Sequence, residues 1–85
     1  MKIDFYTKEN CPFCFRAKTL LDHYNLEYNE YTFPKDFSKG DLKLIISDDK
    51  KPLTVPQIVI NDELIGGFHE LEKYFEKVGT PLDNL

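Results

Sequence analysis

The chain has 85 residues, which is enough for one domain and too few for two. Its 11 basic and 15 acidic residues are interleaved and give a net charge of −4, which excludes the basic face of a nucleic-acid-binding protein. No apolar stretch approaches the about 20 residues of a membrane span, and the N-terminus lacks the apolar segment of a signal peptide. We therefore expect one domain over residues 1–85, cytoplasmic, monomeric and with neither nucleic-acid nor membrane partners.

The N-terminal part of the chain predicts a strand followed by a helix. The run Lys2–Tyr6 is short and β-prone, which favours a first strand. Pro12 suits the first turn of a helix, where its missing N–H costs nothing. The helix extends from about Pro12 to Tyr24, and Asn25 is expected to end it. Its apolar residues follow the i, i+3, i+4, i+7 pattern: Ala17, Leu20, Leu21 and Tyr24.

The middle of the chain predicts a second strand and a short helix. Residues 26–33 alternate in part, and Pro34 ends the strand that they indicate. Its candidate sheet residues are Leu26, Tyr28, Tyr31 and Phe33. The segment 35–49 is less regular, but Asp41 and the apolar residues after it favour a short helix that ends before Asp48.

The C-terminal part predicts a hairpin and a last helix. Gln57–Ile60 is a strand, Asn61-Asp62 a two-residue turn, and residues 63–65 the return strand. Gly66-Gly67 then interrupts the chain. The last helix has apolar residues at helical spacing, with Gly79 and Pro81 just past its end: Leu71, Tyr74, Phe75 and Val78.

The order of these elements is βαβ, then α, then ββ, then α. A right-handed βαβ unit places the first two strands parallel, and the hairpin adds two antiparallel strands. The sequence therefore predicts an α/β, thioredoxin-like fold in which helices cover both faces of a four-stranded mixed sheet.

Two cysteines stand where the first strand gives way to the first helix. Cys11 at the helix start faces unpaired backbone N–H groups and the positive end of the helix dipole, both of which favour a thiolate. Cysteines in such C-x-x-C motifs have pKa values lowered from about 8.5 to roughly 3.5–7.5, and Lys8 adds a nearby cation. Cys14, one turn further on, is less exposed. We expect Cys11 to attack disulfides and Cys14 to resolve the product.

Three other interpretations of the cysteine pair stay open on these residues alone. The pair is a structural thiol pair, half of a zinc site, or a ligand of an iron–sulfur cluster shared between two chains. A zinc site would draw on His23 and His69, whose separation is far from the compact H-x₃₋₅-H spacing. The iron–sulfur alternative would make the protein a dimeric carrier rather than an enzyme.

Five short motifs together resemble the glutaredoxin family in order and spacing. They are Tyr6-Thr7-Lys8, Cys11-Pro12-Phe13-Cys14, Ala17-Lys18, Thr54-Val55-Pro56 and Ile65-Gly66-Gly67. The resemblance implies a glutathione-dependent disulfide oxidoreductase with no metal. Its expected partners are glutathione and disulfide-containing or glutathionylated proteins, ribonucleotide reductase among them.

The resemblance also implies one half of a glutathione site around the T-V-P segment. Pro56 matches the family's cis-proline, which would turn the Val55 backbone toward Cys11, with Thr54 in the same segment. Lys8 would bind the glycine carboxylate of glutathione, ahead of the weaker candidates Gln57, Lys43, Lys50 and Lys51. Phe13 replaces the family's more common Tyr and keeps its aromatic surface.

The other half of the implied site lies at the start of the last helix. Gly67 would let the backbone approach glutathione closely, and the N–H groups of Phe68, His69 and Glu70 would hold the γ-glutamyl carboxylate. Glu70 stands where many relatives have Asp. Glu70 either contacts the γ-glutamyl ammonium or acts only as an acid at the start of the helix. The His69 side chain is expected to be a surface group.

Overall fold

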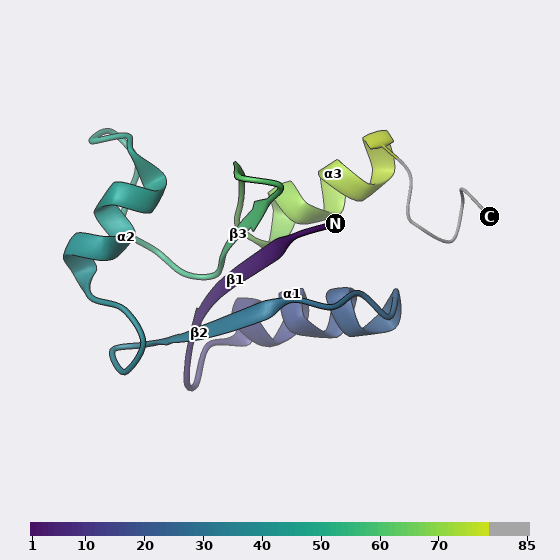
Figure 1. Ribbon diagram of the computed structural model, residues 1–85, viewed down its shortest axis with the longest axis horizontal. Coiled ribbons are helices and arrows are strands. Elements are labelled where there is room, and N and C mark those ends of the chain that lie inside the picture. The colour runs from purple at the N-terminus through teal and green to yellow at the C-terminus, as the bar shows by residue number, and fades with distance from the viewer. Residues whose placement is uncertain (79–85) are drawn as a thin grey trace.

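The computed structural model describes residues 1–78, in which three helices pack against one four-stranded sheet (Figure 1). The elements are β1 (Ile3–Lys8), α1 (Pro12–His23), β2 (Asn29–Phe33), α2 (Lys39–Ile46), β3 (Gln57–Ile60), β4 (Glu63–Gly66) and α3 (Phe68–Val78). This order confirms the predicted thioredoxin-like arrangement. The expected helix end at Gly79 and Pro81 lies outside the described residues.

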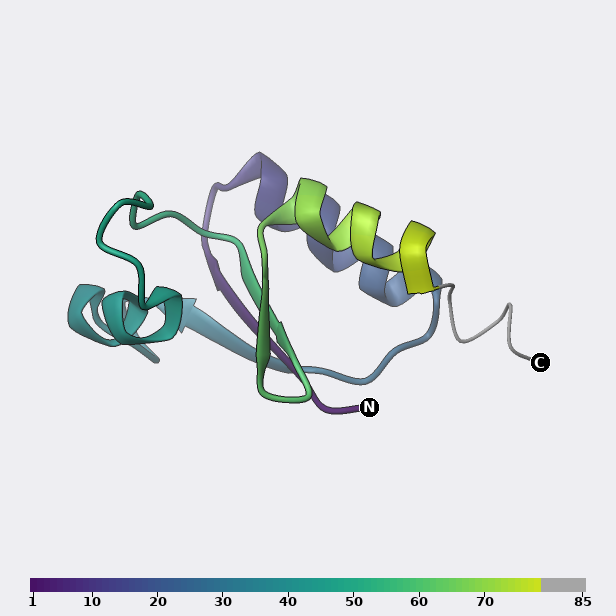
Figure 2. The same ribbon diagram turned by 90° about the horizontal axis from the view of Figure 1, so that it is seen from above.

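The sheet has the strand order β2-β1-β3-β4. β1 and β2 are parallel, as the βαβ unit requires, whereas β1–β3 and β3–β4 are antiparallel. In Figure 2, α1 and α3 lie side by side, and α2 lies apart from both. Asn61 and Asp62 both have positive φ angles, 51° and 67°, which suit the two-residue turn predicted between β3 and β4.

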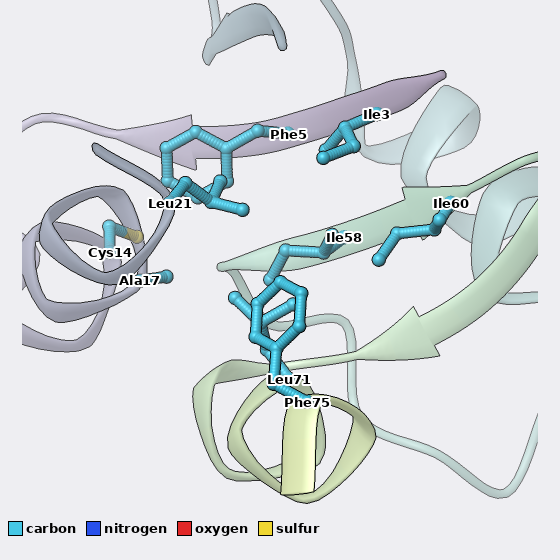
Figure 3. Packing of buried hydrophobic residues seen from close by; sticks show 9 residues of the cluster. All are labelled: Ile3, Phe5, Cys14, Ala17, Leu21, Ile58, Ile60, Leu71 and Phe75. Atoms are coloured by element: carbon cyan, nitrogen blue, oxygen red, sulfur yellow. The ribbon is translucent and has the colours of Figure 1, made fainter. Parts of the chain in front are cut away.

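Two apolar clusters lie on opposite faces of the sheet. The alternation of side chains along β1 sends Phe5 into the larger cluster and Tyr6 toward the smaller one. Figure 3 shows the larger cluster, which joins β1, α1, β3 and α3: Ile3, Phe5, Cys14, Ala17, Leu21, Ile58, Ile60, Leu71 and Phe75. The smaller cluster, Phe37, Leu42 and Ile46, lies under α2. Both faces of the sheet are therefore covered, and the dithiol segment is anchored through Cys14 to the larger cluster.

Three predicted boundaries differ from the structure by two or more residues. β1 runs from Ile3 to Lys8 rather than from Lys2 to Tyr6, because its pairing with β2 continues to the Lys8–Phe33 pair. β2 begins at Asn29 rather than at residue 26, since Leu26 and Tyr28 pack against the larger cluster without joining the sheet.

The third difference concerns α2, which begins at Lys39, two residues before the predicted Asp41. Ser38 caps it: the Asp41 N–H donates to Ser38 Oγ at 3.1 Å, and the Ser38 N–H donates to Asp41 Oδ2 at 2.9 Å. This reciprocal capping box fixes the start of the helix.

Within residues 1–78, every helix is too short or too polar to cross a bilayer.

Candidate functional site

The two cysteines meet at the junction between β1 and α1. Cys11 is the N-cap of α1, with extended backbone angles, and Pro12 occupies the first helical turn. The Cys14 N–H donates to Cys11 Sγ at 3.3 Å, which is the contact expected of a sulfur at a helix start. The two side chains form a disulfide, so the structure shows the oxidised state. Cys11 is half-buried and Cys14 is 3% exposed, so solvent reaches one sulfur far more readily than the other.

Asn10 is a residue of this junction that the sequence analysis missed. It has a φ angle of 57°, in the left-handed region that Asn tolerates better than most residues. This conformation lies immediately before the extended Cys11 and turns the chain from the end of β1 into the start of α1. The sequence feature that could have indicated this turn is an Asn directly before the C-x-x-C motif.

The T-V-P segment lies directly against Cys11. The carbonyl oxygen of Val55 is 3.8 Å from Cys11 Sγ, and the Val55–Pro56 peptide bond is cis, as the resemblance implied. β3 begins at Gln57, so Val55 precedes the paired part of the sheet and its backbone is outside the ladder. The structure thus brings Cys11, Val55 and Pro56 together, as the family resemblance implied.

A groove of about 350 Å³ runs from this segment toward α2. Lys8, Thr54 and Val55 line it together with Lys39, the first residue of α2. The groove therefore carries two cations. Its other lining residues are Phe33, Phe37, Leu42 and Leu53. Lys39 was not predicted, because it is far from Lys8 in sequence and only the packing of α2 against the sheet brings it to the groove.

The weaker candidates for binding the glycine carboxylate do not line the groove. Gln57 is buried, and its side-chain amide donates to the Thr54 carbonyl oxygen at 2.9 Å, which holds the T-V-P segment in place. Lys43 lies on α2, while Lys50 and Lys51 lie in the loop that follows it.

The start of α3 faces the other side of the dithiol. The Gly67 N–H donates to Glu70 Oε1 at 3.0 Å, and the Leu71 N–H donates to the Gly67 carbonyl oxygen at 3.0 Å. Glu70 is therefore a helix-start acid in this structure, one of the two roles expected for it. Gly66 has a φ angle of 121°, a conformation that residues other than glycine rarely adopt. This conformation turns the chain from the end of β4 into the start of α3.

Aromatic rings connect α3 to the C-P-F-C motif. The Phe13 ring centroid lies 6.3 Å from that of Phe68 and 5.6 Å from that of His69. The Arg16 guanidinium carbon lies 5.2 Å from the Phe13 centroid, within cation–π range. His69 is exposed and lies 3.6 Å from Glu72, so its side chain is a surface group as expected. Phe13 is 46% exposed and forms an accessible wall beside the dithiol.

A second, wider hollow of about 780 Å³ borders the disulfide on the β2 side. Thr7, Cys11 and Cys14 contribute to it, and the Lys18–Glu30 ion pair, 3.2 Å long, lies at its rim. A disulfide open on this side and flanked by a groove on the other can exchange with an incoming thiol.

In the part of the chain that the structure describes, no group of three or more His, Cys, Asp or Glu side chains is placed to hold a metal ion.

Comparison with known proteins identifies the family of this chain. The glutaredoxin family model matches residues 3–65. Glutaredoxin 3 of Escherichia coli K12 is 38% identical over 69 residues, which are 81% of this chain and 80% of that protein. A probable glutaredoxin of Synechocystis, slr1562, is 37% identical over 70 residues, or 82% of this chain but only 62% of the longer relative.

Solved structures agree with this result. Glutaredoxin 1 from Francisella tularensis, crystallised with cacodylate, has a TM-score of 0.72 at 34% identity and covers 91% of this chain and 94% of its own. A buckwheat glutaredoxin–glutathione complex has a TM-score of 0.73 and covers 91% of this chain and 70% of its own, and at 23% identity it supports the fold alone. On its motifs, its fold and its sequence relatives, the chain belongs to the glutaredoxin family.

Proposed function

We propose that the chain is a glutathione-dependent thiol–disulfide oxidoreductase that reduces protein disulfides and protein–glutathione mixed disulfides. The observation that carries the proposal is the asymmetry of the dithiol. Cys11 Sγ accepts a backbone N–H at the start of α1 and lies beside the Val55 carbonyl, whereas Cys14 is almost fully buried. A helix N-terminus stabilises a thiolate, which is the nucleophile in disulfide exchange.

With a mixed disulfide, the proposed reaction uses Cys11 alone. The Cys11 thiolate attacks the glutathione sulfur, the S–S bond breaks, and the protein sulfur leaves as a thiolate. A second glutathione thiolate then attacks the glutathione sulfur held on Cys11. This releases oxidised glutathione and restores the Cys11 thiolate.

With a protein disulfide, the proposed reaction also needs Cys14. The substrate is first held on Cys11 as a mixed disulfide. The Cys14 thiolate then attacks Cys11 Sγ, which expels the substrate sulfur and forms the Cys11–Cys14 disulfide seen here. Two glutathione molecules reduce this disulfide and leave as oxidised glutathione.

The groove and the T-V-P segment support a site for the glycine end of glutathione. Lys8 and Lys39 provide two cations for its carboxylate. The backbone of Val55, free of the sheet ladder, suits pairing with the cysteinyl part as a short added strand. Thr54 borders the same groove. The exposed Phe13 ring beside the dithiol is proposed to pack against the bound tripeptide.

The start of α3 supports a site for the γ-glutamyl end. Because Gly67 has no side chain to cap the helix, we expect the N–H groups of Phe68, His69 and Glu70 to bind the γ-glutamyl carboxylate. The Glu70 carboxylate, which accepts from the Gly67 N–H, is proposed to attract the γ-glutamyl ammonium in addition to its role at the helix start. The glutaredoxin family to which the chain belongs favours glutathione as the ligand here.

The proposal includes a cytoplasmic, monomeric protein. Its protein substrates are disulfide-containing or glutathionylated proteins, with ribonucleotide reductase among them. The family of the chain and the reducing compartment in which a dithiol of this kind works favour this setting.

A glutathione-coupled turnover assay with hydroxyethyl disulfide, whose mixed disulfide with glutathione is the substrate, tests the proposal. Cys11→Ser should abolish turnover, because it removes the nucleophile. Cys14→Ser should retain much of it and lose the reduction of a protein disulfide such as that of insulin. Equal loss in both variants, or a wild-type protein that ignores glutathione, would refute the assignment.

A further inference from the structure

A shallow apolar hollow of about 340 Å³ lies along the outer side of α1, apart from the glutathione groove. It starts beside the C-P-F-C motif, where Phe15 of α1 and Phe68 of α3 form its near end, and it extends toward His23. Its lining residues are Phe15, Arg16, Thr19, Leu20, His23 and Phe68. The α1 positions among them fall on one helical stripe, facing away from the buried Cys14, Ala17 and Leu21.

Phe15 lines both this hollow and the wider one beside the disulfide, and it belongs to neither apolar core cluster. It is 72% exposed, while Phe13 on the same turn leans against Phe68 and His69. Within residues 1–78, Phe15 takes part in no aromatic pair. An exposed aromatic ring at the edge of an apolar hollow is typical of a surface that a partner covers.

Arg16 is the one guanidinium and His23 the one imidazole among the residues that line the hollow. Arg16 is held over the Phe13 ring, and His23 lies at the far end. No acidic side chain lines the hollow. From Phe15 to His23 the helix rises about 12 Å, at 1.5 Å per residue. That length accommodates about three to four residues of extended chain.

We propose that this hollow docks the peptide segment next to the reactive cysteine of a protein disulfide, and that it selects an apolar residue followed by an acidic one. The inference rests on the proposed function, because the segment is bound while its sulfur exchanges with Cys11. The apolar side chain covers Phe15 and Phe68, and the carboxylate faces Arg16. The hollow thereby sets which protein disulfides the enzyme prefers, while glutathione uses the separate groove.

The test compares two short peptides, each supplied as a disulfide-linked dimer. In one, the cysteine is followed by leucine, valine and glutamate; in the other, by glycine, serine and glutamine. Their reduction is followed in the glutathione-coupled assay with wild type, Phe15→Ala and the control Leu44→Ala. Leu44 is 77% exposed on α2 and lies outside the hollow, so its loss removes similar exposed apolar surface elsewhere.

We expect wild type to prefer the apolar-acidic peptide in kcat/KM. Phe15→Ala should lower kcat/KM for that peptide about fivefold, as partial burial of one aromatic side chain implies. The same variant should leave the glycine-serine peptide and hydroxyethyl disulfide unchanged, and Leu44→Ala should change none of the three. Replacing the glutamate of the first peptide by glutamine should also lower kcat/KM for that peptide. The decrease should be smaller at high salt, which screens the attraction between the carboxylate and Arg16.

An unchanged peptide preference in Phe15→Ala would overturn the docking proposal. An equal loss of kcat/KM for hydroxyethyl disulfide and for the apolar-acidic peptide would overturn it too. A wild-type dimer in sedimentation that Phe15→Ala dissociates would also overturn it, because a second copy would then cover the hollow. Failure of the wild type to turn over hydroxyethyl disulfide with glutathione would instead refute the proposed function, so the two failures are distinguishable.

Discussion

Replacement of Gly66 by alanine tests how the backbone sets the start of α3. Gly66 has a φ angle of 121°, and holding a side chain in that region costs about 1–3 kcal/mol. A Cβ there would lie 3.0 Å from both Glu70 Cγ and Glu70 Oε1. Glu70 would have to move and give up its hydrogen bond to the Gly67 N–H, at about 0.5–1.5 kcal/mol more. We expect a total loss of about 3 kcal/mol in the free energy of unfolding.

Thermal and urea unfolding of wild type, Gly66→Ala and the control Gly40→Ala measure this effect. For a domain of this size, about 3 kcal/mol lowers Tm by roughly 10–25 °C. A Cβ at Gly40 in α2 meets only Ser38 Oγ, at 3.6 Å, so that variant should be neutral or gain up to about 1 kcal/mol. Gly66→Ala should also raise KM for glutathione, because Glu70 and the helix start move. A loss below about 1 kcal/mol, or one matched by Gly40→Ala, would refute this reasoning.

Two further predictions concern the groove and α2. Lys39→Ala should raise KM for glutathione about two- to fivefold with kcat nearly unchanged, because an exposed cation adds about 0.2–1 kcal/mol of binding. Lys43→Ala on the same helix is the control. An equal rise in KM in both variants would remove Lys39 from the site. The Ser38 backbone N–H, and then its hydroxyl, lowers the pKa of the Asp41 carboxyl. A lowered pKa adds stability that is present above the ordinary carboxyl pKa and is lost as pH falls through the lowered value. The Tm difference between wild type and Asp41→Asn should therefore shrink from pH 7 to pH 2, and a constant difference would contradict this cause.

The parts of the fold that follow local rules could be predicted from the sequence. Asn25 has a φ angle of 55° just past the end of α1, as expected of a residue that terminates a helix. The hairpin turn at Asn61-Asp62 and the position of Cys11 at the start of α1 also follow from neighbouring residues alone. The capping box of α2 had a local signal, Ser38 followed three residues later by Asp41, which the sequence analysis did not use.

The parts that depend on tertiary packing could not be predicted in this way. Leu26 and Tyr28 have the alternation of a strand, but they lie in the segment that connects α1 to β2, where their partly buried side chains pack against the larger cluster. Lys39 reaches the groove only because Phe37 and Leu42 anchor α2 under the sheet. The resemblance to a family supplied the pairing of Val55 with Cys11, which no local pattern gives.

The most direct measurement of the central claim is the rate at which iodoacetamide modifies each cysteine of the reduced protein, located by peptide mapping between pH 5 and pH 8. Since Cys11 lies at a helix start and Cys14 is buried, we expect Cys11 to react at least about tenfold faster, even near pH 6 where an ordinary thiol is mostly protonated. Equal rates, or faster modification of Cys14, would contradict the account.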